Sequence, residues 1–415
     1  MTKKLLLILA AALFNAFLIT EVESISMPPS EMYLYGTITT IDNEQYTGQI
    51  RWGNEEAFWF DFFNSSKPEN DNIDYLSDED LEALERKCKK KRKSWIGWSN
   101  AWNDCNHLST HSFACQFGDI KSIQPMRGER ISVVLRNNEV LRLDGGSNDV
   151  GATIRVSDAE MGVLKIKWDR IDKIEFNQAE TPYESAFGTP LYGTVKTSEG
   201  TFKGFLQWDH DERLTNDELN GESKNGELDI LFGNIKSIAK TYRGSEVTLL
   251  SGRQFDLRGS NDVDDDNRGI IVNLPGVGRV DIPWEEFISI EFGPAPNSAP
   301  TYQNFNIIKP INGTVITLDE DEMSGDIVYD LDESYDLEIL DGMVGHLEYS
   351  IPFRYIDSIQ PKSDDESLVK LKNGKSLLLS DKVDVTEEND GVLIKSSRAE
   401  SRYVIWEEVG EIRLY

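Results

Sequence analysis

All three cysteines and two of the four histidines lie close together in the sequence, where they could bind a metal ion or form a disulfide. Their spacing is Cys105-x-His107-x3-His111-x3-Cys115, and Cys88 precedes the run. Thiolate and imidazole are the usual zinc ligands, but the run lacks the C-x2-C spacing typical of zinc sites. Export to an oxidising compartment would favour a disulfide. We therefore predict one disulfide among the three cysteines, with zinc bound by the two cysteines and two histidines of the run as the alternative.

Tryptophans gather in the same part of the chain. Trp95, Trp98 and Trp102 are spaced i, i+3, i+7, so they would share one face of a helix, and Trp59 lies at the edge of the region. The favoured interpretation is that these rings pack against the neighbouring β domain. The alternative is a contact surface for a glycan, or for an anionic membrane because the basic run 86–93 is adjacent.

Catalytic motifs are missing from the sequence. There is no Gly-x-Ser-x-Gly, no His-Glu-x-x-His and no phosphate loop. Asp262-x-Asp264-x-Asp266 begins like a calcium loop, but Asn267 and Asn273 replace the required glycine and bidentate glutamate. We assign no catalytic residue and predict no cofactor, and we leave open a loose binding of calcium by the many carboxylates.

The net charge and the N-terminal segment limit the possible functions and locations of the protein. The net charge of −30 argues against a nucleic-acid surface, which needs Lys and Arg on phosphates. Residues 1–24 resemble a secretory signal, with Lys3 and Lys4 before a short apolar run. We expect an exported protein, periplasmic or extracellular, without a transmembrane span in the mature chain. Retention of the signal as an anchor is the less favoured alternative.

The elements that position these residues recur three times. Three short sequence motifs, which we call phrases, occur once in each copy. The first phrase surrounds Gly36, Gly193 and Gly313, and the second begins at Phe117, Phe232 and Phe353. A third contains Trp168, Trp284 and Trp406, which are 116 and 122 residues apart. Repeats of this kind indicate homologous units. We predict three domains at 31–176, 191–292 and 311–415, the first carrying a helical insertion at 64–113.

Each unit is expected to be β, because Val, Ile, Thr and aromatic residues alternate with polar ones between turn signals. In the third phrase the apolar spacing changes from two to three after the Trp, which predicts a 3₁₀ turn before a last strand. Each copy also looks double, since Ile282-Pro-Trp-Glu-Glu-Phe-Ile-Ser-Ile and Ile351-Pro-Phe-Arg-Tyr-Ile-Asp-Ser-Ile share one pattern.

This pattern resembles SH3-like or Sm-like small barrels, in particular those of bacterial envelope proteins. The resemblance implies an all-β fold in which each domain consists of two SH3-like small-barrel units, and it carries no chemistry. On this basis Trp168, Trp284 and Trp406 should be buried in equivalent environments. The same is expected of Trp52, Trp208 and Tyr329.

Two local signals predict structure rather than function. Gly-Ser-Asn-Asp-Val occurs at 146–150 and 259–263, with Asp384-Val385 in the third place, and an Asn-Asp pair typically caps a turn. Ser77 followed by acidic residues predicts the start of a helix in the insertion.

The function expected from these features is that of a non-enzymatic, exported scaffold or binding protein whose partner is a protein or glycan of the cell envelope. Function specific to this chain would lie on residues 58–113, since copies two and three lack the insertion. The alternatives are a glycan-binding protein using the aromatic residues of the insertion, and an enzyme with an unrecognised carboxylate site.

Overall fold

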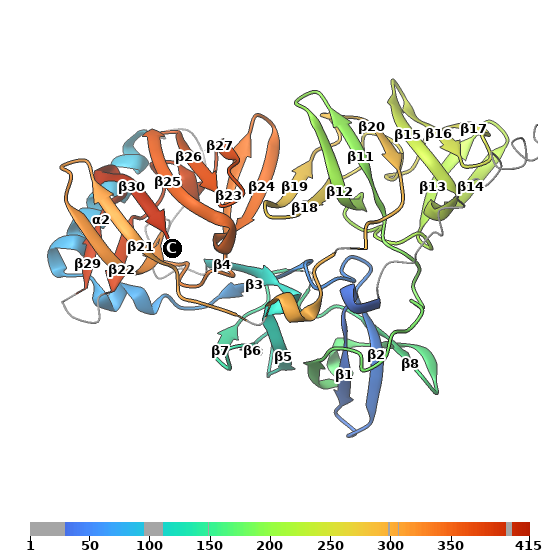
Figure 1. The fold of residues 1–415 in the computed structure, drawn as a ribbon, viewed down its shortest axis with the longest axis horizontal. Coiled ribbons are helices and arrows are strands. Elements are labelled where there is room, and N and C mark those ends of the chain that lie inside the picture. Colours follow the sequence, from blue (N-terminus) through green and yellow to red (C-terminus); the bar gives the residue numbers. More distant parts are fainter. Residues whose placement is uncertain (1–29, 95–110, 148, 298, 306, 396–400) are drawn as a thin grey trace, which may run out of the picture.

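The computed structural model describes residues 30–94, 111–147, 149–297, 299–305, 307–395 and 401–415, and only the backbone of 88–94. Within these residues the chain forms 30 β-strands and a single α-helix, so the all-β prediction is confirmed. All pairs between these strands are antiparallel, and the strands fall into three consecutive units (Figure 1). We call residues 35–176 unit 1, residues 192–292 unit 2 and residues 312–414 unit 3.

Unit 1 contains the first ten strands. They are β1 (Tyr35–Thr40), β2 (Gln45–Trp52), β3 (Phe62–Lys67), β4 (His111–Gln116), β5 (Ile120–Pro125), β6 (Ile131–Leu135), β7 (Val140–Leu143), β8 (Ile154–Asp158), β9 (Gly162–Ile166) and β10 (Ile171–Phe176). Eight of them form one sheet in the order β7-β6-β5-β10-β1-β2-β8-β9, and β3 and β4 form a separate hairpin.

Unit 2 repeats the same sequence of strands. They are β11 (Tyr192–Thr197), β12 (Thr201–Trp208), β13 (Glu218–Ser223), β14 (Gly226–Leu231), β15 (Ile235–Thr241), β16 (Gly244–Leu249), β17 (Gln254–Leu257), β18 (Ile270–Leu274), β19 (Gly278–Ile282) and β20 (Phe287–Phe292). In unit 3 the strands are β21 (Asn312–Thr317), β22 (Glu322–Tyr329), β23 (Ile339–Val344), β24 (Leu347–Pro352), β25 (Ile356–Ser363), β26 (Glu366–Leu371), β27 (Ser376–Ser380), β28 (Val392–Lys395), β29 (Arg402–Val404) and β30 (Val409–Leu414).

The strand pairings recur as well. The first strand of each unit pairs with the second and the tenth, and the fifth pairs with the sixth and the tenth. The repeated glycine of the first phrase lies in this first strand. A Cβ on Gly36 would lie 2.2 Å from the carbonyl oxygen of Glu175 on the tenth strand, and the same clash would occur at Gly193 and Gly313. The glycine therefore recurs because two backbones approach each other closely at that point.

The two halves of each unit exchange strands, which corrects the expectation of two separate small barrels. Independent five-stranded barrels would each pair their own first and last strands. In unit 1, β1 instead pairs with β10 of the second half, and β6 pairs with β5 of the first. The strand β2 likewise pairs with β8 across the halves. Units 2 and 3 do the same, so each unit is one interlocked body.

A repeated aromatic group fills each core. Trp52, Trp208 and Tyr329 are all buried, which confirms the prediction for this position. Each makes an edge-on contact with the tryptophan of the third phrase, at centroid distances of 5.8, 6.0 and 5.8 Å. The second and third phrases form 3₁₀ turns at Phe117–Asp119, Trp168–Arg170, Phe232–Asn234, Phe353–Tyr355 and Trp406–Glu408.

Trp168 departs from its equivalents. Trp284 and Trp406 are buried as predicted, whereas Trp168 is only partly buried. In unit 2 the ring of Trp284 stacks on Phe287, with centroids 5.2 Å apart. Unit 1 has Ile171 at the position of Phe287 and unit 3 has Val409, so neither of these units contains the stacked pair.

The insertion is shorter than predicted. Strands β3 and β4 pair from Phe62↔Gln116 to Lys67↔His111, and this hairpin matches β13–β14 of unit 2. Residues 64–67 and 111–113 therefore belong to the repeated framework, and the insertion proper spans 68–110. It contains the predicted helix, α2 (Asp78–Ser94). Ser77 caps it, since the amide of Asp80 donates to the Ser77 hydroxyl at 3.2 Å.

The helix α2 of the insertion packs on unit 3, and Figure 1 shows it beside β21, β22 and β29. Leu84 is buried against Val328, Leu331 and Leu393. The Lys87 ammonium donates to the carbonyl of Asn389 at 2.5 Å. The first part of the insertion is thus a clasp between units 1 and 3.

Units 2 and 3 share a sheet and a core. Strand β19 pairs with β24, so that 18 strands form one sheet, and one continuous apolar cluster spans both units. Unit 1 lies below their junction in Figure 1, and its apolar cluster also takes in Phe205 and Leu214 of unit 2 and Leu337 of unit 3. The linkers complete that cluster, because Phe187, Tyr302 and Phe305 from the two linkers are buried in it.

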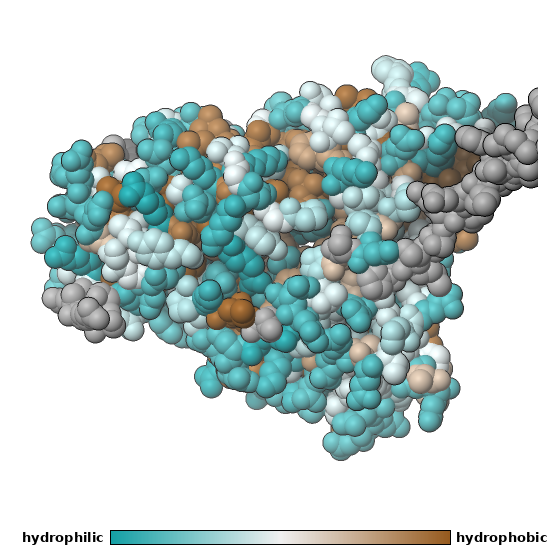
Figure 2. All heavy atoms as spheres, in the orientation of Figure 1, coloured by the Kyte–Doolittle hydropathy of each residue, from teal (hydrophilic) through white to brown (hydrophobic). Residues whose placement is uncertain are grey.

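The face shown in Figure 2 is mostly hydrophilic, in keeping with the net charge of −30, and hydrophobic side chains show mainly over units 2 and 3. Within the part of the chain that the structure describes, no helix combines the length and the apolar character that a membrane crossing requires.

Candidate functional site

Trp59 is a core residue. Its side chain is 1% exposed, its indole nitrogen donates to the Glu31 carbonyl at 3.0 Å, and its ring faces Tyr302 of the linker at 4.4 Å. It cannot contact a ligand at the surface of this structure. Its three companions in the sequence, Trp95, Trp98 and Trp102, lie outside the described residues, and their role stays a prediction.

The Cys and His residues of the proposed zinc site are not brought together where the structure describes them. His111 and Cys115 lie four residues apart on β4, which separates them by about 13 Å in an extended strand. They cannot share an ion whose ligands lie about 2 Å from it. Cys105 and His107 fall outside the described residues.

Cys115 carries a free, buried thiol, and burial raises the pKa of that thiol well above its usual value. Among the described residues no disulfide is formed. The side chain of Cys88, like all of Cys105, is not described, so a bond between these two stays a prediction.

The Asn-Asp turns hold neighbouring strands, as a capping role predicts. A carboxylate oxygen of Asp149 accepts the Asn64 amide at 2.6 Å. Two aspartates in the other units do the same: Asp262 accepts from Asn220 and Asp384 from Asp341, both at 2.6 Å. Their backbone carbonyls accept from the side chains of Trp52, Trp208 and Tyr329. Because the same bonds occur in all three units, this aspartate belongs to the repeated framework of the fold.

A glutamate also recurs beside each of these aspartates, at Glu56, Glu212 and Glu333. Each forms a backbone bridge with the central aromatic residue. Burial raises the pKa of Glu212 to about 9, and it raises those of Glu56 and Glu333 well above the usual value. Burial also raises the pKa of Asp149 to about 6 and that of Asp384 to about 8. These side chains therefore carry protons at pH values where ordinary carboxyls have lost them.

Raised pKa values often mark active sites. Here one oxygen of Glu212 and one of Glu333 are buried without a hydrogen-bond partner, and Asp209, Glu212 and Asp262 lie within 4.8 Å of one another. However, the same Glu and Asp positions recur in all three units beneath the central aromatic ring. The repetition indicates a structural role, since a single active site would not need three copies.

The joints of unit 1 with the other units contain ion pairs beside the apolar contacts of Phe205, Leu214 and Leu337. Arg51 forms two bonds with Asp217 of unit 2, at 2.6 and 2.8 Å, and the fully buried Arg213 of unit 2 contacts Asp61. Towards unit 3, Lys67 contacts Glu338. Asp61, Asp217 and Glu338 are equivalent positions, and each also accepts two backbone amides of its own loop. The loop that follows the second strand therefore recurs as the connector between units.

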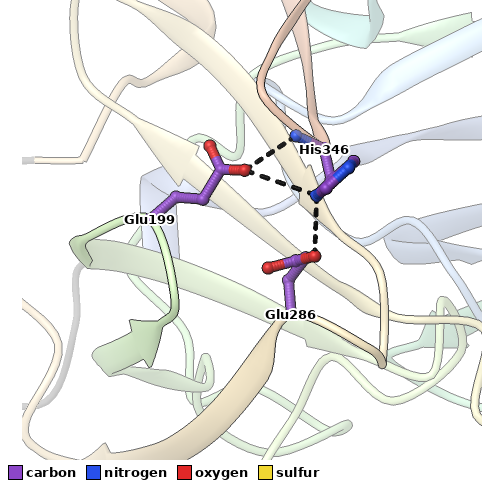
Figure 3. Close-up of side chains that lie close together, drawn as sticks. All are labelled: Glu199, Glu286 and His346. Atoms are coloured by element: carbon purple, nitrogen blue, oxygen red, sulfur yellow. Dashed lines mark hydrogen bonds and ion pairs between the residues drawn. The ribbon is translucent and has the colours of Figure 1, made fainter.

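A different cluster lies at the surface between units 2 and 3 (Figure 3). Glu199 comes from the turn between β11 and β12, Glu286 from the turn before β20, and His346 from the turn between β23 and β24. The His346 Nδ1 lies 2.9 Å from the Glu286 carboxylate and 3.6 Å from that of Glu199. The histidine side chain is 76% exposed, whereas the side chains of Glu199 and Glu286 are 25% and 16% exposed.

No sequence motif marks this cluster. Glu199 and His346 are 147 residues apart, and in the sequence each is an ordinary polar residue of a turn. Only the pairing of β19 with β24 brings the two units into contact here. His210, by comparison, pairs with Asp281 alone at 3.0 Å.

Two open hollows lie at the surface of the described residues. One of about 670 Å³ lies in unit 1 between the turns around Arg127 and Gly145. Another of about 440 Å³ lies beside Arg136 and Tyr302. Neither contains the buried carboxyls described above.

Comparisons with known proteins give no family. No family model and no curated protein matches the chain. Among solved structures, a streptogramin B lyase was found at 11% identity and a TM-score of 0.13, covering 72% of this chain and 94% of the other.

Proposed function

We propose that this chain is a non-enzymatic, exported scaffold or binding protein, built as three interlocked β units. The observation that carries the proposal is the repetition of the buried acidic residues. The groups best suited to acid–base chemistry, Glu56, Glu212 and Glu333, occupy the same place in each unit, where their backbone bridges to the central aromatic residue. The aspartates beside them, Asp149, Asp262 and Asp384, accept backbone amides of neighbouring strands.

The connections between units favour the same proposal. Four joints, made by strand pairing, ion pairs, buried linker residues and the α2 clasp, leave the units little freedom to move apart. A body of this kind suits the presentation of surfaces at fixed distances, since rigid scaffolds commonly carry functional loops. The expected partner is a protein or glycan of the cell envelope.

A binding panel tests the proposal. The mature chain is immobilised and exposed to envelope glycans, peptides and anionic vesicles, while plasmon resonance records binding and mass spectrometry records the fate of each ligand. We expect saturable binding of a ligand that is recovered unchanged. Chemical conversion of a ligand that is lost in Glu212→Gln, but kept in the exposed control Glu227→Gln, would contradict the proposal.

Export belongs to the same proposal and rests on the N-terminal sequence. N-terminal sequencing of protein from the producing cell should show a chain that begins near residue 25. A mature end at Met1 or Thr2 in a cytosolic fraction would refute this part.

A further inference from the structure

We propose that Glu199, Glu286 and His346 form a binding site for a divalent transition metal ion of the zinc class, which bridges units 2 and 3. The proposal does not depend on the scaffold function. The three side chains offer one imidazole nitrogen and two carboxylate oxygens, all within 4.8 Å of one another (Figure 3). Imidazole nitrogen and carboxylate oxygen are both zinc ligands, and three protein ligands with a fourth position left to water is the arrangement of open zinc sites.

The distances fit such an ion. Ligand atoms about 2.0–2.1 Å from a tetrahedral zinc lie about 3.3 Å from each other. The His346 Nδ1 lies 2.9 Å from one carboxylate oxygen and 3.6 Å from the other, on either side of that value. Small rotations of the exposed imidazole are therefore enough to place all three atoms around one ion.

Neighbouring groups hold both carboxylates in position. The Ser198 hydroxyl donates to the second oxygen of Glu286, and the backbone amide of His346 donates to Glu199 at 2.9 Å. Hydrogen bonds of this kind orient metal ligands and raise their affinity.

The charge and position of the cluster favour a cation. Two carboxylates with a neutral imidazole carry two negative charges, which a divalent ion balances. The glutamates come from unit 2 and the histidine from unit 3, so a bound ion would cross-link the units beside the β19–β24 pair. The exposed outer side of the imidazole leaves the ion open to water and to exchange.

Titration of the chelator-treated full chain with Zn²⁺ in a calorimeter tests the site, and Co²⁺ absorption reports tetrahedral coordination. We expect that His346→Ala removes one equivalent of bound zinc and weakens binding more than about 100-fold. Ser198→Ala should weaken it about 10–100-fold, as loss of a supporting hydrogen bond does.

The matched control is His210→Ala, which removes a histidine that contacts one carboxylate only and should leave the affinity unchanged. Glu286→Gln provides a second variant of nearly equal size. Equal stoichiometry and affinity in the wild type, His346→Ala and Glu286→Gln would overturn the proposal, as would zinc binding that His210→Ala weakens to the same extent.

Discussion

Units 2 and 3 are held together by other interactions than those that hold unit 1 to them. Units 2 and 3 are joined by backbone hydrogen bonds between β19 and β24 and by one continuous apolar core. Unit 1 is attached through buried ion pairs, aromatic linker residues, the α2 clasp and the apolar side chains of Phe205, Leu214 and Leu337. The first joint depends on many small contributions, whereas the second depends on a few side chains.

This difference has an energetic consequence. Backbone pairing and apolar contacts tolerate many substitutions because shape and hydrophobicity can be kept in several ways. A buried ion pair adds little net stability over an apolar pair, yet removing one partner leaves a buried, uncompensated charge. Single substitutions should therefore loosen unit 1 far more easily than they separate units 2 and 3.

The largest effect is expected at the ionic joint. Arg213→Ala should lower the free energy of unfolding by about 3–5 kcal/mol, because Asp61 would stay buried without its cation. Urea unfolding followed by circular dichroism measures the loss. Arg413→Ala, which removes an exposed partner of Glu411, is the matched control and should change stability by less than about 1 kcal/mol.

A double variant sharpens this test. Arg213→Met combined with Asp61→Asn should recover much of the lost stability, since neither charge remains and the Asn oxygen can still accept the loop amides. If Arg213→Ala alone is as stable as the wild type, the ionic description of this joint fails.

Truncation of the core tryptophan should lower stability more in unit 2 than in unit 1. Trp284→Ala should cost about 3–5 kcal/mol as loss of a buried aromatic residue. Trp168→Ala should cost clearly less, because that ring is only partly buried. The comparison is made by thermal unfolding under identical conditions. Equal losses would mean that the two rings are equally covered in solution.

Because of the buried acidic residues, we expect the free energy of unfolding to fall as the pH rises. Their pKa values are raised on folding, to about 6 for Asp149, 8 for Asp384 and 9 for Glu212, so the folded chain holds protons that the unfolded chain releases. The stabilisation is complete below the usual carboxyl pKa and is lost as pH rises through these values.

Glu212→Gln keeps the shape of the protonated acid without its titration. Between pH 6 and pH 8 it should lose about 2–3 kcal/mol less stability than the wild type, given about 1.4 kcal/mol per pH unit for one group. Urea unfolding at a series of pH values measures the difference. Glu227→Gln, on an exposed strand position, should follow the wild-type curve.

The smallest effect is expected at the clasp. Leu84→Ala should cost about 2 kcal/mol, because Leu84 packs in a small satellite cluster on unit 3. Hydrogen exchange should speed up in α2 while the strands of unit 2 keep their protection. The exposed control Glu82→Ala should leave α2 as protected as in the wild type.

Much of the fold could be predicted from the sequence. The alternation of apolar residues indicated strands, and the change of spacing after the repeated tryptophan indicated the 3₁₀ turn now found at Trp168–Arg170. These signals depend on the spacing of residues close together in the chain, so they are visible in the sequence. The exchange of strands between halves is not local, because β1 pairs with β10 while β5, much nearer in sequence, pairs with β10 and β6.

Predictions of site residues were less successful than those of strands, because contacts between distant segments decide where site residues lie. Trp59 looked like an edge residue of the insertion, but Tyr302, far along the chain, covers its ring. The cluster of Glu199, Glu286 and His346 has no sequence signal, since its members come from three separate turns. Clustering of Cys105, His107, His111 and Cys115 in the sequence did not mean clustering in space where the structure describes them, because an extended strand moves His111 away from Cys115.

The sequence by itself determined the β character, the three-fold repetition and the aromatic residue at each core, because these depend on local spacing and on hydrophobicity. Tertiary structure decided which strands pair, which acidic residues are buried and protonated, and where side chains of different units meet. Those outcomes depend on the removal of water from particular groups and on contacts between distant segments. Neither the linear order nor the composition of a chain specifies such contacts.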